Sequence, residues 1–272
     1  MKALAEFGNH LIREEKSSLT VEKYVRDVGQ FLAWLGAGEL SKESTLAYKQ
    51  WLMERYAVAS VNSMLSALNC YLEFLGRPDC RVKQLKQQRR AFLPEEKELT
   101  EPEYRRLLEA ARGKKRLWLL MQTICTTGIR VSEHRFITVE AAKKGCAQVQ
   151  LKGKCRLVLL PGKLCRALLR YAREQGIRRG SIFVTASGRP LDRCNIWAEM
   201  KKLCSTAGVS REKVFPHNLR HLFARIYYSL EKDIVRLADI LGHASVDTTR
   251  IYTMESGKTH RMQIERMGLF VT

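Results

Sequence analysis

Apolar side chains recur at helical spacing through the first part of the chain. In "LTVEKYVRDVGQFLAWLG", residues 19–36, one set of apolar positions falls three or four residues apart along the whole stretch. Its members are Val21, Tyr24, Val25, Val28, Phe31, Leu32 and Leu35. This period predicts an amphipathic helix, with Thr20 placed to cap its start and Gly36 to end it.

A second stretch repeats the pattern, and two weaker ones flank it. "SVNSMLSALNCYLEFLG", residues 60–76, carries its apolar positions at the same spacing and again closes on a glycine. They are Val61, Leu65, Leu68, Tyr71, Leu72 and Leu75. Helices are also expected near residues 2–15 and 42–56. The four together predict a small all-helical bundle over residues 1–76.

The pattern weakens after this bundle. Residues 77–98 contain two prolines, few apolar side chains and many basic ones, which is typical of a linker. Its basic run is either a solvated tether or a set of phosphate contacts, and the second reading is favoured for Lys83, Lys86, Arg89 and Arg90.

Residues 99–272 read as a second, mostly helical domain with one exception. In "AQVQLKGKCRLVLLP", residues 147–161, polar and apolar positions alternate and then run apolar around a Lys-Gly-Lys turn, which predicts a β-hairpin. The expected fold is therefore mainly α with a small β-hairpin, and a helical bundle precedes an α+β domain. The four tryptophans, Trp34, Trp51, Trp118 and Trp197, are expected to be core anchors.

Charge adds the first indication of function. The chain has 272 residues with 48 Lys and Arg against 28 Asp and Glu, a net charge of +20. The excess is concentrated in the second part, with +16 after residue 90 and +4 before it. A folded protein this basic is expected to bind a polyanion, and nucleic acid is the first candidate.

Other patterns exclude several classes of protein. The apolar runs are far shorter than the ~20 residues of a membrane span, and the N-terminus lacks the features of a signal peptide. Eight cysteines are scattered without a CxxC pair, so no metal site is expected. The simplest expectation is a cytoplasmic protein with free thiols and no membrane partner.

Three polar islands interrupt the apolar pattern of the second domain. The first is "TTGIRVSEHRF", residues 126–136, where Gly128 ends an apolar helix and Arg130 and Glu133 follow. Arg130 could bind a phosphate in a forked geometry, with Glu133 holding it in place. The alternative is an ordinary ion pair between residues three apart on a helix.

The second island is "FPHNLRHLFARIYYSL", residues 215–230. Pro216 indicates a helix start, and His217 and Arg220 then share one helix face, with His221 one turn beyond His217. The alternative is a polar first turn of an otherwise amphipathic helix.

The third island is "DIVRLADILGHASVDTTRIYT", residues 233–253. A helix is expected to end at Gly242, with His243 at the turn and Ser245 or Asp247 capping a short helix that carries Tyr252. Two guanidinium groups can clamp a phosphodiester and neutralise charge in its transition state. A histidine can move a proton near neutral pH, and a tyrosine can attack phosphorus. This chemistry needs no metal or other cofactor.

The three polar islands resemble the conserved boxes of one family, the tyrosine recombinases or phage integrases. "TGIRVSE" resembles its first arginine box, "HNLRH" its H-x-L-R-H box, and "LGHASVDTTRIYT" its L-G-H…Y-T box, in the family order. Looser similarity over the first two helical stretches implies a core-binding, SAM-like four-helix domain. The resemblance implies a two-domain C-clamp around DNA, with a catalytic domain over residues 99–272.

The resemblance also implies a role for each residue of the islands. Arg130 and Arg220 would bind the scissile phosphate, and His217 would act as the general acid or base. His243 would donate to a non-bridging oxygen, and Tyr252 would form a 3′-phosphotyrosyl link. Glu133 and His221 would support these groups.

The hairpin departs from the family spacing. Lys152, in "LKGKCR", would protonate the 5′ leaving oxygen, but the step to Arg156 is one residue shorter than in the family pattern. Lys154 therefore remains the alternative for this role and is otherwise a DNA contact. The helix expected at residues 257–268 would dock in cis or onto a neighbouring subunit.

Because the core-binding pattern begins near residue 1, the chain resembles the Xer-like recombinases. These act on short core sites of double-stranded DNA as tetramers, with partner recombinases or accessory proteins in some systems. Two alternatives remain open: a DNA-binding protein on the same fold without catalysis, and a type IB topoisomerase.

Overall fold

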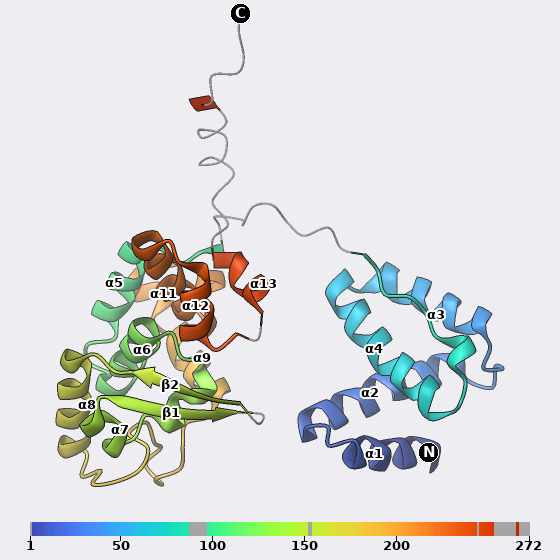
Figure 1. Cartoon of the computed structure of the whole chain (residues 1–272), viewed down its shortest axis with the longest axis horizontal. Coiled ribbons are helices and arrows are strands. Elements are labelled where there is room, and N and C mark those ends of the chain that lie inside the picture. The colour runs from blue at the N-terminus through green and yellow to red at the C-terminus, as the bar shows by residue number, and fades with distance from the viewer. Residues whose placement is uncertain (1, 87–96, 152–153, 244, 253–264, 267–272) are drawn as a thin grey trace, which may run out of the picture. The chain divides into compact units, whose positions relative to one another are not determined.

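The computed structural model describes residues 2–86, 97–151, 154–243, 245–252 and 265–266. The chain forms two compact units, residues 1–89 and 90–272, which are described separately (Figure 1). Within the described residues, no helix is both long enough and apolar enough to cross a membrane.

The first unit, called here the helical unit, contains the four predicted helices and a short 3-10 turn. They are α1 (Lys2–Arg13), α2 (Ser18–Leu35), α3 (Lys42–Arg55), α4 (Val58–Phe74) and η1 (Pro78–Cys80). The predicted cap is wrong at one position: Ser17, not Thr20, caps α2, because the Ser17 hydroxyl accepts the Thr20 N–H at 3.3 Å. Gly36 follows α2 with φ +59°, as a helix-ending glycine should.

The centre of the helical unit is apolar and rich in aromatic rings. Val28, Phe31, Leu65 and Leu72 are fully buried, all of them positions predicted from the helical period. Phe31 also packs edge-on against Tyr48, with 5.0 Å between ring centroids. Periodicity therefore located the part of this core that α2 and α4 contribute.

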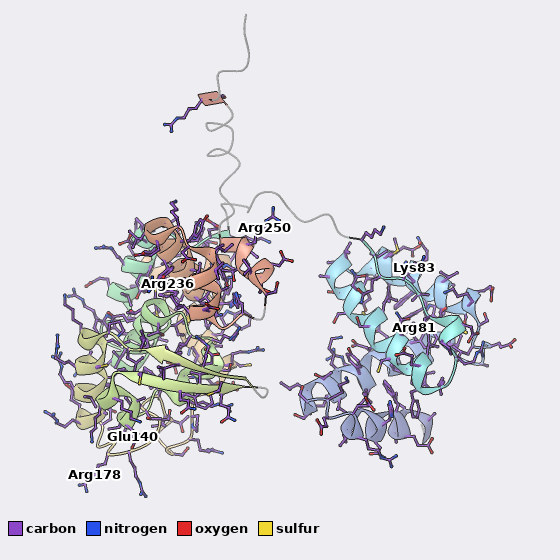
Figure 2. The ribbon with its side chains drawn as sticks, in the orientation of Figure 1. Arg81, Lys83, Glu140, Arg178, Arg236 and Arg250 are labelled. Carbon is purple, nitrogen blue, oxygen red and sulfur yellow. The ribbon has the colours of Figure 1, made fainter. Side chains whose placement is uncertain are left out.

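The chain after α4 lies along the helical unit. Asn69 brackets the backbone of Val82, accepting its N–H at 2.9 Å and donating to its carbonyl at 2.8 Å. Asn62 brackets Leu85 in the same way, at 2.8 and 3.0 Å. Part of the segment assigned to a linker, residues 78–85, is thus held on α4. Arg81 and Lys83 both lie on this segment (Figure 2).

The second unit is mainly helical and contains the predicted hairpin. It is called here the catalytic unit, after the catalytic domain that the resemblance implies for these residues. Its longer helices are α5 (Glu101–Ala110), α6 (Lys115–Thr127), α8 (Gly162–Glu174), α9 (Arg193–Lys201), α11 (Pro216–Glu231) and α12 (Ile234–Leu241). Shorter ones are η3 (Val131–Phe136), α7 (Val139–Lys144), α10 (Cys204–Ala207), η4 (Arg211–Lys213), α13 (Val246–Thr249) and η5 (Arg250–Tyr252).

The hairpin consists of β1 (Cys146–Leu151) and β2 (Lys154–Leu159), paired antiparallel from Cys146–Leu159 to Leu151–Lys154. Ala147, Val149 and Val158 are buried, while Leu157 and Leu159 on the opposite face are 60% and 73% exposed. The hairpin prediction is confirmed. One face of the hairpin therefore packs into the unit, and Arg156 belongs to that inward set by its alternation.

The core of the catalytic unit forms around α6, which packs against α11 and α8. Gly128 ends α6 with φ +64°, and a Cβ at this position would lie 2.5 Å from the Phe223 ring. A glycine is required there for both reasons. This close approach brings the end of α6, and the arginine after it, next to α11.

Candidate active site

The three polar islands of the sequence meet in one place in the catalytic unit. Arg130 precedes η3, Arg220 and both histidines of the second island lie on the first half of α11, and His243 and Tyr252 flank α13. Of these elements, η3 and α11 both contact α6, while η5 contacts α11 and α13 contacts α12 (Figure 1).

Arg220 is the most deeply buried member of the group, with only 1% of its surface exposed. Its guanidinium donates to the carbonyls of Gly128 and Leu241, the latter at 2.7 Å, and lies 2.9 Å from Nε2 of His243. Burial, and next the charge of Arg130, lower the pKa of Arg220 to about 10. The side chain is thus fixed by two helix-end carbonyls and stays a cation at neutral pH.

Arg130 is held by the carboxylate three residues after it. Its Nη1 donates to Oε1 of Glu133 at 3.0 Å, and its backbone N–H donates to Oε2 at 2.7 Å. Its Nη2 donates to the Gly242 carbonyl at 3.3 Å. The Arg130–Glu133 ion pair, which is the alternative expected from the sequence, is therefore present. It is not an ordinary surface pair, because the Glu133 side chain is only 1% exposed while that of Arg130 is 39% exposed. Because Glu133 is buried and Arg130 is partly exposed, the carboxylate holds the guanidinium in a fixed orientation, which an ordinary surface ion pair does not do.

His243 is locked between a cation and a hydroxyl. Nε2 lies 2.9 Å from Nη2 of Arg220, and Nδ1 lies 2.8 Å from Oγ1 of the buried Thr249. Since a guanidinium can only donate, Nε2 accepts from Arg220 and Nδ1 carries the proton towards Thr249. Burial, followed by Arg220 and Arg130, lowers the pKa of His243 to about 4.

His217 and His221 face each other one turn apart on α11, with ring centroids 4.5 Å apart. Burial lowers the pKa of both rings, aided at His217 by Arg220 and Arg130 and at His221 by His217 and Arg225. The pKa of His221 falls to about 3. Both imidazoles are therefore neutral near pH 7, and His217 can accept a proton.

Tyr252 is 4% exposed and packs between two of these rings. Its ring meets His221 edge-on, with 4.9 Å between centroids and an interplanar angle of 85°, and stacks on His243 at 6.0 Å and 20°. The same side chain belongs to a small apolar cluster with Leu237 and Leu241. The phenol is thus held within the histidine–arginine group by contacts with two imidazole rings and with apolar side chains.

One residue of the site was missed by the sequence reasoning. Arg156 on β2 donates to Oε2 of Glu133 and to the Ile240 carbonyl, and it is 14% exposed. Gly242 leaves room for it: a Cβ there would lie 2.4 Å from Cδ of Arg156. The signal available in the sequence was its place on the inward face of the predicted hairpin.

A cavity of about 510 Å³ opens beside the cluster. Arg130, His217 and Arg220 line one part of it, and α9 contributes Arg193, Cys194 and Trp197. The expectation that Trp197 is a core anchor is wrong, because this ring is 50% exposed. On α9, Ile196 and Met200 face the core instead, and the tryptophan is left on the outer side.

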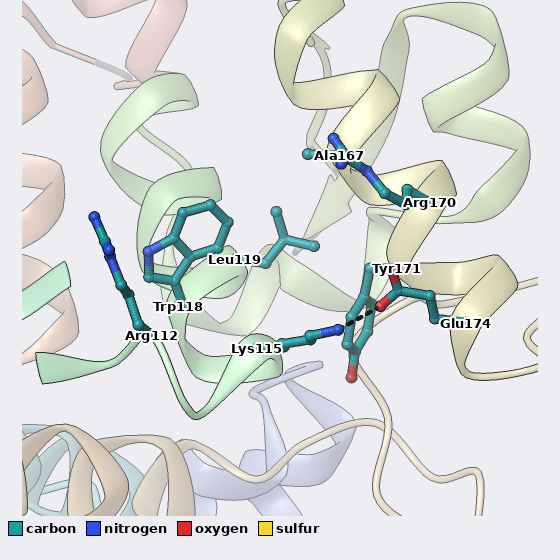
Figure 3. Close-up of a pocket in the computed structure, with 8 residues that line it drawn as sticks. All are labelled: Arg112, Lys115, Trp118, Leu119, Ala167, Arg170, Tyr171 and Glu174. Carbon is teal, nitrogen blue, oxygen red and sulfur yellow. Dashed lines mark hydrogen bonds and ion pairs between the residues drawn. The ribbon is translucent and has the colours of Figure 1, made fainter. Parts of the chain in front are cut away.

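A second cavity, of about 490 Å³, lies between α6 and α8 (Figure 3). Trp118, Leu119 and Tyr171 line it, and a 3.1 Å ion pair between Lys115 and Glu174 lies at its edge. It shares no lining residue with the cluster of histidines and arginines. The chemistry therefore belongs to the first cavity.

Several predicted site residues cannot be placed. Lys152, Arg89 and Arg90 lie outside the described residues, as does the side chain of Lys154 and nearly all of the helix expected at 257–268. Lys83 and Lys86 are exposed on the segment that follows η1.

Comparisons with known proteins agree on the family. Residues 97–258 match the Phage integrase family, and residues 4–78 match the phage integrase N-terminal SAM-like domain. Tyrosine recombinase XerA of Pyrococcus furiosus is 29% identical over 98% of this chain and 94% of the relative. XerA of Thermococcus kodakarensis is 30% identical over 93% and 90%, and XerD of Xanthomonas campestris pv. campestris 31% over 93% and 87%.

Solved structures are similar over the same length. The crystal structure of XerA recombinase is 26% identical, with a TM-score of 0.55 over 99% of both chains. A lambda integrase dimer bound to a COC′ core site has a TM-score of 0.74 over 94% of this chain and 96% of that chain, at 17% identity, which supports the fold. The chain therefore belongs to the phage integrase family and is a tyrosine recombinase of the Xer type.

Proposed function

We propose that this enzyme recombines DNA at specific sites, by cleaving and rejoining strands through a covalent 3′-phosphotyrosyl intermediate on Tyr252. The observation that carries the proposal is the packing of Tyr252 between His221 and His243, which in turn contacts the buried Arg220. The contact of this phenol with two imidazole rings, one of them hydrogen-bonded to a buried guanidinium, supports a role for it in attack on a phosphorus atom.

Each neighbour of the phenol has a role in this reaction. Arg130 and Arg220 bind the non-bridging oxygens of the scissile phosphate and stabilise the charge that develops on them. His217, neutral and within the cavity, accepts the phenol proton. As the phenol oxygen bonds to phosphorus, the 5′ oxygen leaves and takes a proton from the hairpin lysine, Lys152 or the alternative Lys154.

His243 needs a change of partner to donate to the phosphate. Its Nε2 accepts from Arg220 in the DNA-free enzyme. A phosphate oxygen bound to Arg220 would compete for that donor and would favour the form of His243 that carries a proton on Nε2. Thr249, with a hydroxyl that can donate as well as accept, can support either form at Nδ1.

The DNA and the assembly are inferred from the relatives. XerH recombinase has been solved bound to its difH substrate, and lambda integrase as a tetramer on a Holliday junction. We propose that this chain likewise acts on double-stranded core sites as a tetramer, in the cytoplasm, and that Lys83, Lys86, Arg89, Arg90 and Lys154 contact DNA phosphates. The net charge of +20 supports this assignment.

The test is covalent trapping on a library of nicked duplexes with randomised sequence around the nick. The nick lets the cleaved strand diffuse away, so attack leaves a protein–DNA adduct that survives denaturing electrophoresis. Tyr252→Phe is expected to give no adduct, while it keeps the ring packing and the binding of the selected duplex. An adduct that persists in Tyr252→Phe would rule out this nucleophile.

A second assay separates recombination from the alternatives. Recombinant products from two plasmid-borne copies of the selected site are expected with the wild-type enzyme. Relaxation of supercoiled plasmid without such products would indicate a topoisomerase, and binding without any adduct would indicate a DNA-binding protein without catalysis.

A further inference from the structure

Two cations share a single carboxylate in the catalytic unit, and a third cation lies within range of its charge. Arg130 and Arg156 both bind Glu133, one at each carboxylate oxygen, and Arg220 lies beyond them at His243. Glu133 is 1% exposed. Burial lowers the pKa values of His217 and His243, so these two rings add no charge to the site near pH 7.

The position of Arg156 joins three elements of the site. It comes from β2, binds the carboxylate of η3, and donates to the carbonyl of Ile240 near the end of α12. Its side chain fills the space that Gly242 leaves open, directly before His243. Burial lowers the pKa of Arg156, and the charge of Glu133 offsets part of that effect.

The charges around Glu133 determine how much net positive charge Arg130 presents to a bound phosphate. A single arginine paired with a buried carboxylate is close to neutral as seen from the cavity. Arg130 and Arg156 both pair with Glu133, and Arg220 feels the charges of all three. The three guanidinium groups and one carboxylate together carry two net positive charges. A phosphodiester under attack gains a second negative charge as it becomes pentacoordinate, so the two charges match.

We propose that Arg156 is a positioning residue of the strand-cleavage reaction, which shares the charge of Glu133 so that Arg130 remains an effective cation for the scissile phosphate. The proposal rests on the proposed function, since it concerns the same phosphate. Arg156 acts through Glu133 and Arg130 and does not itself need to touch DNA.

The test compares a charged and a neutral scissile group in single-turnover cleavage. The substrates are the selected nicked duplex with its ordinary phosphodiester and the same duplex with a methylphosphonate at the scissile position. Arg156→Met is expected to slow phosphodiester cleavage on the order of 100-fold, as loss of an electrostatic contribution does. On the neutral substrate, which develops one negative charge fewer, the loss is expected to be less than about tenfold on the same grounds.

A matched control is available in the same unit. Arg116 also binds one carboxylate and one carbonyl, Glu199 at 3.1 Å and Val184 at 3.0 Å, but lies outside the cluster. Arg116→Met is expected to change cleavage of both substrates by the same small factor. Arg156→Lys, which keeps the charge but not the fork, is expected to recover part of the lost rate on the phosphodiester.

Two outcomes would overturn the proposal: equal losses on both substrates in Arg156→Met, which would indicate a purely structural role, or no loss on either.

If Arg156→Met does not fold, the test uses Glu133→Gln instead, alone and combined with Arg156→Lys. Removing the carboxylate charge should make the cleavage rate insensitive to the change at position 156. A cleavage rate that still responds fully to that change would contradict charge sharing. Failure of the proposed function is distinct, because wild-type enzyme would then form no adduct with either substrate.

Discussion

The buried centres of the two units differ in how many polar and charged side chains they contain. In the described part of the helical unit, the buried polar or charged side chains are Asp27 and Thr45, and the centre is otherwise apolar and aromatic. In the catalytic unit, Glu133, Arg220 and Thr249 lie as deep as the leucines around them. Buried charge contributes little to stability. In the catalytic unit it coincides with the place where the three polar islands meet, which is where the fold serves chemistry.

The largest expected effect comes from removing the most deeply buried cation, in Arg220→Ala. This change leaves the carbonyls of Gly128 and Leu241 without their donor and removes a phosphate ligand. Single-turnover cleavage should fall by about 10³-fold, and denaturant titration should show a loss of about 2–4 kcal/mol of unfolding free energy. Leu65→Ala in the helical unit is the control: it should cost about 2–5 kcal/mol and leave cleavage in the bound complex unchanged.

The histidines of the catalytic unit should make its stability depend on pH. The pKa values of His221 and His243 are lowered to about 3 and 4, so between those values and 6.5 the unfolded chain binds more protons than the folded one. Stability is therefore complete above about 6.5 and is lost as the pH falls towards 4, by roughly 1–2 kcal/mol after discounting for solvent screening.

Denaturation curves from pH 7.5 to 4.5 would measure this slope. His221→Asn should flatten it in the transition of the catalytic unit. A slope unchanged by that substitution would place the pH dependence elsewhere in the chain.

A smaller effect is expected at the hydroxyl that holds His243. Thr249→Val keeps the shape of the side chain and removes the partner of Nδ1. Loss of one neutral hydrogen bond corresponds to up to about tenfold in the cleavage rate. Thr248 is exposed, so Thr248→Val should not change the cleavage rate. Equal cleavage rates for the two variants would show that the Thr249 hydroxyl has no role in the reaction.

The smallest effect should come from a buried hydroxyl in the helical unit. The Tyr48 hydroxyl is buried without a hydrogen-bond partner among the described residues, and burial raises its pKa. Tyr48→Phe removes an unsatisfied group, so the unfolding free energy should change by less than about 1 kcal/mol or rise. A substantial loss of stability would mean that this hydroxyl has a partner. The same chemical change at Tyr252 should abolish cleavage.

The helices and the hairpin could be predicted because their information is local. The positions of Val28, Phe31 and Leu65 follow a period that needs no knowledge of partners, and so does the alternation around Arg156. The candidate residues Arg130, His217, Arg220, His243 and Tyr252 were selected from polar islands and a family resemblance. The structure brings them together in the catalytic unit.

The position of a residue in the core or at the surface, and the place where an irregular segment docks, could not be predicted, because both depend on which elements pack together. Periodicity cannot distinguish Trp197, left on the outer side of α9, from a core tryptophan. Nor does local sequence show that residues 78–85 would be held by the amides of Asn62 and Asn69.

The sequence by itself determined the two kinds of element and the set of polar side chains available for chemistry, because both follow from residue type and spacing. Only the tertiary structure decided that Arg156 of the hairpin reaches Glu133 and passes Gly242. The reason is physical: a guanidinium finds its carboxylate through packing between elements far apart in the chain, and neither partner carries a local sign of the other.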